Sequence, residues 1–550
     1  MRKVITSKIK FYYRPIIIAL LINFLSVFYF GTFYEDYEGC LSSLVHGTYT
    51  LPATKEWYVD IQFLLFSLYG FINSLFPSIQ VYGLVLVISN FIALCVAGSV
   101  FYRVLIINLK KFNIIFFTLC YFIFSVDNIL NLSSTRISLI LIFSVLAFVE
   151  SRRVENKKIG IGMWCILAVL LFIAYLFRVE VLFLSATIYL FVLLIFKKIH
   201  RFSLILFAIS FIGFFGYNFL VTNIVDEPKL VCFYKEKEFF DRNSIDYSHL
   251  TERQALDVKA FREYGITDKE HFTWKFYNDI AIKNSDNIIG WKSLLRGIKI
   301  SAFLQTLQLS YYAIYSARYF IFFFIIASIN LLIFSRSRII HIFYIVFSIL
   351  FPLLICFNTV LAERFLVPYF SALGCLSLCL SIAEKNGKYI TEMTICAFLF
   401  ILLFANTKID MNDYLKANDK YQKSIVKLNS MIGENMYNNP IVICDFNLEK
   451  FFPFNPLEQS KIQNAVFLNF YYFSISSCYI ERWNQLHVKN SYSLKEKIDY
   501  IVSNNNKIII DERTFNFLEE YYLIKYKTGL QKVNVVSFDN ELVVCNLCYR

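Results

Sequence analysis

The sequence predicts an α-helical membrane protein of about eleven spans that carries a small α/β domain at its C-terminal end. Hydrophobic residues make up 57% of the 550 residues and charged residues only 17%, whereas soluble domains average about 25% charged residues. The apolar residues form long blocks, and a helix of about 20 apolar residues crosses a bilayer. The blocks cover residues 15–33, 81–102, 112–126, 137–149, 160–177, 180–196, 203–222, 318–334, 340–357, 365–382 and 390–405.

The loops between the blocks alternate in charge, and this alternation predicts the side of the membrane on which each loop lies. Basic residues such as Arg152 and Arg153 gather in every second loop, and the loops between them are acidic or mixed. Basic loops stay in the cytoplasm, so the N-terminus is predicted inside and residues 34–80, 223–300 and 406–550 outside. The net charge of +13 therefore reflects membrane orientation and predicts no nucleic-acid partner.

The chain divides into two predicted domains. Residues 1–405 are predicted to form the transmembrane domain, in which the apolar stretch 60–76 lies along the outer surface as a helix, because a span there would invert every later loop. Residues 406–550 are predicted to form an extracytoplasmic α/β domain. We expect strands at "NPIVICDF" (439–446), "NKIIIDE" (506–512) and "NELVVCNL" (540–547), and helices at "TERQALDVKAFREYG" (251–265) and "TFNFLEEYYLIKY" (514–526).

The most informative stretch for function is "YEDYEGCLSSLVHGTYTLP" (34–52), directly after the first apolar block. It places Glu35, Asp36 and Glu38 at the predicted outer membrane boundary. Ionised carboxylates are costly near hydrocarbon and commonly mark functional sites there. The alternative is that these acids only keep the loop outside and cap the next helix. Position alone leaves both interpretations open.

This stretch resembles the first outer loop of GT-C glycosyltransferases, in particular the branch of protein O-mannosyltransferases and lipid A aminoarabinose transferases. In that family an acidic pair ends the first span, and a short helix, a Gly-x-aromatic-x-x-Pro turn and membrane-surface helices follow. Asp36 matches the catalytic acid. The turn is matched by Gly47, Tyr49 and Pro52. The family pair is often Asp-Glu, whereas this chain has Glu35-Asp36, so Glu35 stays an alternative to Asp36.

Two later stretches resemble the same family. Arg178 and Glu180 match an Arg-x-Glu pair at the outer start of a span. Arg364 and Pro368 match the Arg-x-x-x-Pro opening of a late span. The three likenesses are spread over residues 1–385 and share one predicted side of the membrane. Their order and shared side, rather than any single motif, carry the resemblance.

The resemblance implies a role for each kind of residue. Asp36, or Glu35 in its place, deprotonates the acceptor hydroxyl as general base. Arg178 and Arg364 bind the phosphate of the donor, because the planar guanidinium fork suits phosphate oxygens. The further candidates for substrate binding are Glu38, Glu180 and Asp127.

Other candidates have a simpler structural interpretation. For Asp127 a helix cap is an equal alternative to substrate binding. Arg136 and Arg318 also map near the outer face, but we interpret them as interfacial anchors. No metal-ligand set and no cofactor is predicted, because the resembled branch works mostly without a metal. A divalent cation held by Asp36 and Glu38 is the less favoured alternative.

The sequence therefore predicts an inverting membrane glycosyltransferase in the plasma membrane of a bacterium, since Lys-, Asn-, Ile- and Phe-rich usage is typical of AT-rich bacterial genomes. Its partners would be a polyprenyl-phosphate-linked sugar, membrane lipids, and a polysaccharide, glycolipid or protein acceptor. One alternative is an O-antigen or capsule polymerase or ligase centred on residues 223–300. A polysaccharide flippase without catalysis is another, and it would not depend on Asp36.

Overall fold

The structure, a computed structural model, describes part of the 550 residues. The described segments are 33–34, 38–46, 48–49, 63–108, 128–129, 131–154, 158–178, 247–264, 266–272, 307–308, 310–334, 338–356, 365–367, 369–370, 373–374, 412–431, 439–444, 450–453, 455–457, 464–469 and 477–550, with single residues at 21, 125, 212, 216, 276, 280 and 377. Every statement about structure below concerns these residues.

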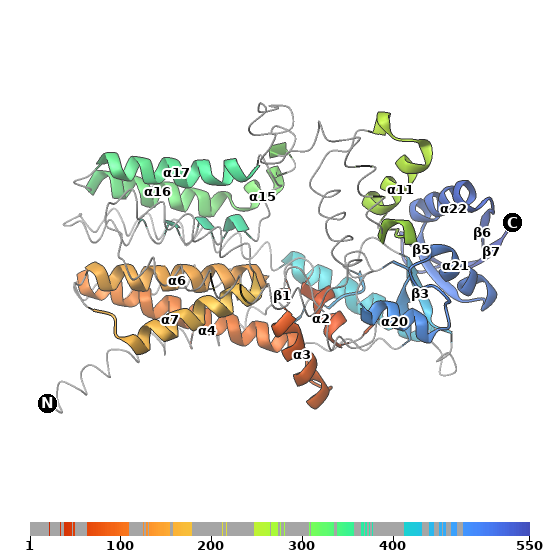
Figure 1. Cartoon of the computed structure of the whole chain (residues 1–550), viewed down its shortest axis with the longest axis horizontal. Helices are drawn as coiled ribbons and strands as arrows, with labels where there is room; N and C mark the ends of the chain where they lie inside the picture. Colours follow the sequence, from red (N-terminus) through yellow and green to blue (C-terminus); the bar gives the residue numbers. More distant parts are fainter. Residues whose placement is uncertain are drawn as a thin grey trace.

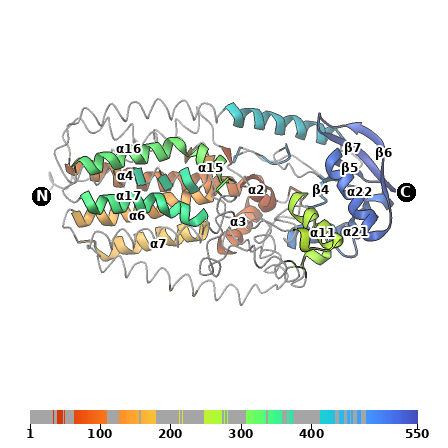
Figure 2. The same cartoon turned by 90° about the horizontal axis from the view of Figure 1, so that it is seen from above.

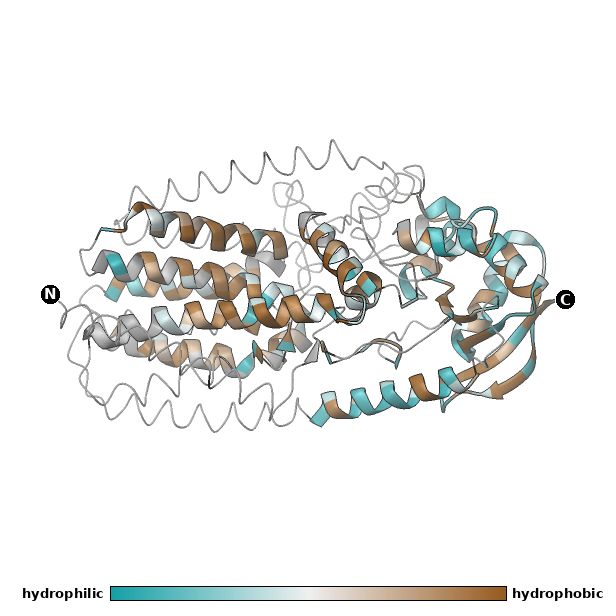
Figure 3. Cartoon of the chain, turned by 90° about the horizontal axis from the view of Figure 1, so that it is seen from below, coloured by the Kyte–Doolittle hydropathy of each residue, from teal (hydrophilic) through white to brown (hydrophobic). Residues whose placement is uncertain are grey.

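Long apolar helices form one half of the molecule (Figure 1). Helix α6 (Ser134–Val154) packs between α4 (Val81–Asn108) and α7 (Ile161–Phe177). Helix α16 (Arg318–Phe334) packs against α17 (Arg338–Cys356). Hydrophobic residues dominate these helices, whereas hydrophilic residues gather toward the C-terminal end of the molecule (Figure 3). The two ends of the protein are thus chemically different.

The prediction of an eleven-span membrane protein is wrong. Among the described residues, one helical stretch is long and apolar enough to cross a membrane, Val81–Ser99 within α4, and 50% of its most apolar window is buried inside the protein. Helix α7 and the stretches Phe320–Ile329 and His341–Leu353 are apolar but shorter. An apolar run predicts that a segment is buried, but it does not distinguish burial in lipid from burial in a protein core.

Several predicted spans have no described counterpart. The blocks at 15–33, 112–126, 180–196, 203–222 and 390–405 lie outside the described residues apart from isolated positions, and 365–382 is described only in part. The division of the chain at residue 405 stays a prediction.

Two short helices and strand β1 lie between the apolar helices and the C-terminal end (Figure 1). Helix α2 (Glu38–His46) packs against α3 (Phe63–Leu75). Strand β1 (Phe33–Tyr34) pairs in parallel with β2 (Asn131–Leu132). Helix α3 confirms the helix predicted at 60–76, and its place at a membrane surface stays a prediction.

The segment 247–272 forms a 3-10 turn η2 (Tyr247–His249), helix α11 (Glu252–Glu263) and a second turn η3 (Lys269–Phe272). Helix α11 confirms the helix predicted at 251–265. It starts at a capping box in which the Thr251 side chain accepts from the Gln254 amide, and the Gln254 side chain accepts from the Thr251 amide. This reciprocal pair satisfies two amide groups that a helix start otherwise leaves without partners.

The C-terminal part contains a five-stranded sheet in the order β4-β3-β5-β7-β6. Strands β3, β4 and β5 are parallel, and β7 runs antiparallel to both β5 and β6. The strands are β3 (Ile441–Cys444), β4 (Ala465–Phe467), β5 (Lys507–Asp511), β6 (Leu530–Ser537) and β7 (Leu542–Tyr549). The helices are α20 (Ser477–Gln485), α21 (Leu494–Ser503) and α22 (Glu512–Tyr526). The predicted strands β3, β5 and β7 and the predicted helix α22 are confirmed, whereas β4 and β6 were not predicted.

One buried apolar core joins the two ends of the molecule. It runs from α2, α4, α6 and α7 through to the C-terminal sheet. A second cluster joins α15 (Tyr311–Ser316), α16 and α17 with residues 366–373, and Phe365 packs against both clusters. A helix over 412–431 leads toward the sheet along one side of the molecule (Figure 2) and buries Tyr421, Ile425 and Leu428.

Candidate functional site

A buried polar centre lies where α2 and α6 begin. Glu38, in the first turn of α2, is 3% exposed. Its Oε1 atom accepts hydrogen bonds from the backbone N–H and the hydroxyl of Ser134, both at 2.8 Å, and its Oε2 atom accepts from the hydroxyl of Tyr82. Ser134 is the first residue of α6, where backbone N–H groups lack helical partners and the helix dipole favours a negative charge. The carboxylate therefore joins the two helix starts.

The environment of Glu38 opposes its ionisation. Burial raises the pKa of its carboxyl above the ordinary value, while hydrogen bonds from Tyr82 and Ser134 and the nearby charge of Arg178 act in the opposite direction. Burial wins because the hydroxyl donors are neutral and remove only part of the desolvation cost.

Arg178 reaches the same centre from the end of α7. Its backbone N–H donates to the carbonyl of Ala174 at 3.0 Å, and its extended backbone, with φ of −158°, ends the helix there. The Arg178 side chain is turned inward, leaving the residue 7% exposed, and its Nε donates to Thr135 Oγ1 at 3.1 Å. Thr135 follows Ser134, so the first turn of α6 contacts both Glu38 and Arg178.

The first turn of α6 has its own cap. The hydroxyl of Ser133 accepts from the backbone N–H of Arg136 at 3.3 Å, as an N-cap residue does. Arg136 itself is 1% exposed, so it is buried among protein atoms, and the interpretation of this residue as an interfacial anchor is wrong. Arg318 is half-buried and its guanidinium stacks 3.8 Å from the ring centroid of Tyr315, and its role as an interfacial anchor stays a prediction.

Five of the predicted site residues lie outside the described residues: Glu35, Asp36, Asp127, Glu180 and Arg364. Their described neighbours nevertheless lead to the polar centre. Tyr34 pairs with Leu132, and Glu38 binds Ser134, so both ends of the 35–37 segment are attached to one short stretch of chain.

The same reasoning applies to the other undescribed candidates. Glu180 lies two residues after Arg178. Asn128, next to Asp127, accepts a hydrogen bond at its carbonyl from Asn90 of α4 at 2.9 Å. Phe365, next to Arg364, packs against both hydrophobic clusters. The structure thus brings Glu38 and Arg178 to one centre, and the roles of the remaining candidates stay predictions.

Sequence reasoning missed three residues of this centre: Tyr82, Ser134 and Thr135. The run Ser133-Ser134-Thr135 before an apolar block is a recognisable helix start. Its carboxylate and guanidinium partners could not be read, because they lie 96 and 43 residues away along the chain. Tyr82 carries no sequence signal at all.

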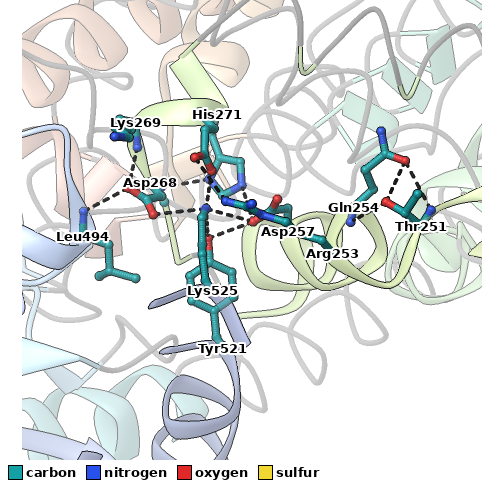
Figure 4. A network of polar contacts seen from close by, with 12 residues as sticks. Thr251, Arg253, Gln254, Asp257, Asp268, Lys269, His271, Leu494, Tyr521 and Lys525 are labelled. Carbon is teal, nitrogen blue, oxygen red and sulfur yellow. Dashed lines mark hydrogen bonds and ion pairs between the residues drawn. The ribbon is translucent and has the colours of Figure 1, made fainter. Parts of the chain in front are cut away.

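A second buried cluster joins the 247–272 segment to the C-terminal domain (Figure 4). Lys525 of α22 lies 3.1 Å from Asp257 Oδ1 and 3.1 Å from Asp268 Oδ2, and it also pairs with Glu270. The backbone N–H of Asp268 donates to His271 Nδ1 at 2.9 Å. The Leu494 amide at the start of α21 donates to Asp268 Oδ1 at 3.2 Å.

Lys525 is the cation that the three carboxylates of this cluster share. Burial alone would raise the pKa of Asp268, but Lys525, Tyr526 and neighbouring groups hold it below its ordinary value. Burial alone would lower the pKa of Lys525, but Asp268, Asp257 and Glu270 raise it. Burial lowers the pKa of His271 to about 4, so this side chain is neutral at pH 7. The cluster is a clamp between two segments, because its charged groups already bind one another.

The part of the chain that the structure describes holds no group of three or more His, Cys, Asp or Glu side chains that could bind a metal ion. No protein-family model, curated protein or solved structure matches the chain.

Proposed function

We propose that the protein is a membrane-associated glycosyltransferase that moves one sugar from a polyprenyl-phosphate donor to a hydroxyl-bearing acceptor. Asp36, or Glu35 in its place, takes the proton of the acceptor hydroxyl. The hydroxyl oxygen attacks the anomeric carbon, the bond from that carbon to the phosphate oxygen breaks, and the lipid phosphate leaves with both bonding electrons. This single displacement inverts the configuration at the anomeric carbon.

The observation that supports the proposal most strongly is that Glu38 and Arg178 bind adjacent residues, Ser134 and Thr135, in the first turn of α6. A glycosyl transfer needs a carboxylate for the acceptor and a cation for the departing phosphate, held a few ångströms apart. Glu38 lies two residues from Asp36, and Arg178 binds Thr135 beside the Ser134 that Glu38 binds. Both oxygens of Glu38 are engaged inside the protein, so Glu38 positions the acidic segment in this proposal while Asp36 or Glu35 acts as base.

The apolar helices support the membrane part of the proposal. Large hydrophobic side chains are exposed along α4, α7, α16 and α17, including Ile161 at 84%, Ile339 at 71% and Phe343 at 61%. Exposed apolar surface of this extent is typical of contact with lipid or another protein. We propose that these faces contact the plasma membrane of a bacterium, that the N-terminus is cytoplasmic, and that the C-terminal domain lies on the extracytoplasmic side, where a lipid-linked donor presents its sugar.

The test measures release of undecaprenyl phosphate from a panel of undecaprenyl-phosphate monosaccharides by the purified chain in liposomes, with polysaccharide, glycolipid and peptide acceptors. Loss of a general base typically lowers the rate about 100- to 10,000-fold, which is the expectation for Asp36→Asn. Arg178→Lys keeps the charge and loses the fork, so turnover should fall well below wild type. Arg253→Lys is the control, because Arg253 is an exposed residue whose ion-pair partner is Glu270, 3.7 Å away, and not a residue of the polar centre.

The same variants separate the alternatives. If Glu35→Gln abolishes transfer while Asp36→Asn does not, the base is Glu35. If neither substitution changes transfer, the glycosyltransferase proposal is contradicted. Sugar-lipid translocation that survives both substitutions would favour a flippase.

A further inference from the structure

The C-terminal domain contacts Tyr49, three residues after the end of α2. Tyr49 is 1% exposed, and its hydroxyl donates to the backbone carbonyl of Phe451 at 2.5 Å. Its ring meets those of Phe452 and Phe467 edge-on, with centroids 5.4 and 4.7 Å away and interplanar angles of 79° and 71°. Phe467 ends strand β4, so Tyr49 is packed directly against the C-terminal sheet.

Gly39 of α2 allows the segment 451–453 to lie close to the helix backbone. A Cβ atom on Gly39 would lie 2.7 Å from the carbonyl oxygen of Pro453. Distances below 3.0 Å do not occur for real Cβ atoms, so only glycine fits here. Gly39 directly follows Glu38. The backbone of the C-terminal domain therefore touches α2 one residue from the carboxylate of the polar centre.

A third contact joins the two regions on the β2 side. The hydroxyl of Tyr414, in the helix over 412–431, donates to Asn131 Oδ1. Asn131 begins β2 and pairs with Phe33 of β1. Both structural elements that flank residues 35–37 are thus in contact with the C-terminal part of the chain, β1 through β2 and α2 through Gly39 and Tyr49.

We infer that the C-terminal domain is a working part of the proposed active site, with Tyr49 as the positioning residue that fixes α2, whose first residue is Glu38. This inference rests on the proposed glycosyl transfer. The physical reason is geometric, because a displacement of about 1 Å at a reacting group can lower the rate about 100-fold. Tyr49 does not need to touch the substrate for this effect.

The test compares Tyr49→Phe with wild type in two measurements. Phenylalanine keeps the ring packing and removes the hydrogen bond from the Tyr49 hydroxyl to the carbonyl of Phe451. Loss of a buried hydrogen bond worth about 1.4 kcal/mol corresponds to a tenfold change in an equilibrium, so amide hydrogen exchange of residues 40–46 should become about tenfold faster. The kcat for transfer from an undecaprenyl-phosphate sugar should fall about 10- to 100-fold, while the KM for that donor stays at the wild-type value.

Tyr369→Phe is the matched control. The hydroxyl of Tyr369 also donates to a buried backbone carbonyl, that of Ser348 at 3.0 Å, but in the cluster around α17. This variant should change neither the exchange of residues 40–46 nor kcat. Gly39→Ala is a second probe, and it should lower kcat further than Tyr49→Phe because the new methyl group pushes against Pro453.

Three outcomes decide the matter. Wild-type exchange in α2 of Tyr49→Phe overturns the inference, because the domain then does not fix the helix. Faster exchange with unchanged kcat overturns the positioning role. If the wild-type protein transfers no sugar from any donor, the proposed function fails, and the exchange experiment alone still decides whether the C-terminal domain holds α2.

Discussion

Two buried carboxylate centres with opposite electrostatics lie in this molecule. At the start of α6, Glu38 is bound by neutral hydroxyls and a backbone amide, and its pKa is raised by burial. In the clamp, Asp268 is paired with Lys525 and its pKa is lowered. A buried carboxylate with a direct cation partner is locked in its charged form, whereas one with neutral donors keeps a protonation state that responds to its surroundings. The cation-paired arrangement of Asp268 suits a structural role, and the arrangement of Glu38 with neutral donors suits a functional site.

The two centres should also respond to pH in opposite directions. A carboxyl whose folded pKa is lowered, such as Asp268, contributes stability above its unfolded pKa, and this contribution is lost as the pH falls. A carboxyl whose folded pKa is raised, such as Glu38, contributes most below its unfolded pKa of 4.5, and that contribution is lost as the pH rises. The predictions below use this difference, from the largest expected effect to the smallest.

The largest effect is expected for Lys525→Met. The substitution leaves Asp257, Asp268 and Glu270 without the cation that they share, and removing one partner of a buried ion pair costs about 3–5 kcal/mol. The free energy of unfolding from urea titration should fall by this amount, while kcat per folded molecule stays unchanged.

Lys497→Met is the matched control. Lys497 is also buried, but its ammonium contacts the hydroxyl of Tyr479 at 3.1 Å, and burial lowers its pKa to about 7. Its removal leaves no unpaired carboxylate, so the free energy of unfolding should change by less than about 1 kcal/mol or rise. Equal losses in the two variants would show that the clamp is not held by its charges.

The next effect is a loss of stability in acid. The pKa of His271 is about 4 in the folded protein and 6.5 when exposed, so between these values the unfolded chain binds a proton that the folded chain does not. The free energy of unfolding should therefore fall as the pH is lowered from 6.5 to about 4, by at most roughly 3 kcal/mol at 1.36 kcal/mol per pKa unit. Urea titrations across this range measure it.

His271→Asn tests whether His271 causes this pH dependence. The His271 side chain faces Asp257, Asp268, Glu270 and Lys525. The variant should lose most of the contribution that His271 makes to the pH dependence of the free energy of unfolding. His46 has a pKa that burial lowers to about 4, so part of the slope remains in the variant. A pH profile that is identical in wild type and His271→Asn contradicts the prediction.

A smaller effect is expected at the Glu38 centre. Tyr82→Phe removes one donor from a buried carboxylate and should lower the free energy of unfolding by about 1–2 kcal/mol. Glu38→Gln removes the titrating carboxyl group. The free energy of unfolding of wild type should therefore fall relative to that of the variant as the pH rises from 4 to 8. Its loss of sugar transfer should be milder than that of Asp36→Asn. If wild type instead becomes more stable relative to the variant as the pH rises, the two centres do not respond to pH in opposite directions.

The smallest effect is expected for Thr135→Val. It removes the hydroxyl that accepts from Arg178 Nε at 3.1 Å and should cost about 0.5–1.5 kcal/mol. In the proposed transferase it should also raise the KM for the donor, because the guanidinium is no longer oriented toward the phosphate. Thr135→Ser keeps the hydroxyl and should restore wild-type KM. Equal KM values in the valine and serine variants would remove Thr135 from the proposed site.

Part of the candidate site could be predicted from the sequence. The boundary acids included Glu38 and the resemblance pointed to Arg178, and the structure brings these two side chains to one buried centre. The resemblance could not identify Tyr82 or Ser134, because a hydroxyl that binds a distant carboxylate looks in sequence like any other tyrosine or helix cap. It also gave no sign that Tyr49 contacts Phe451, which lies 402 residues further along the chain.

The sequence by itself determined the local elements whose signals are short in range. Helix α11 follows from its capping box, and strands β3, β5 and β7 follow from compact apolar runs between polar residues. The tertiary structure alone decided which residues meet, namely Glu38 with Ser134 and Lys525 with Asp268. It also decided that, in the part of the chain that the structure describes, one helical stretch is long and apolar enough to cross a membrane. The physical reason is that periodicity and capping act within a few residues, whereas burial and charge pairing depend on segments brought together by the fold.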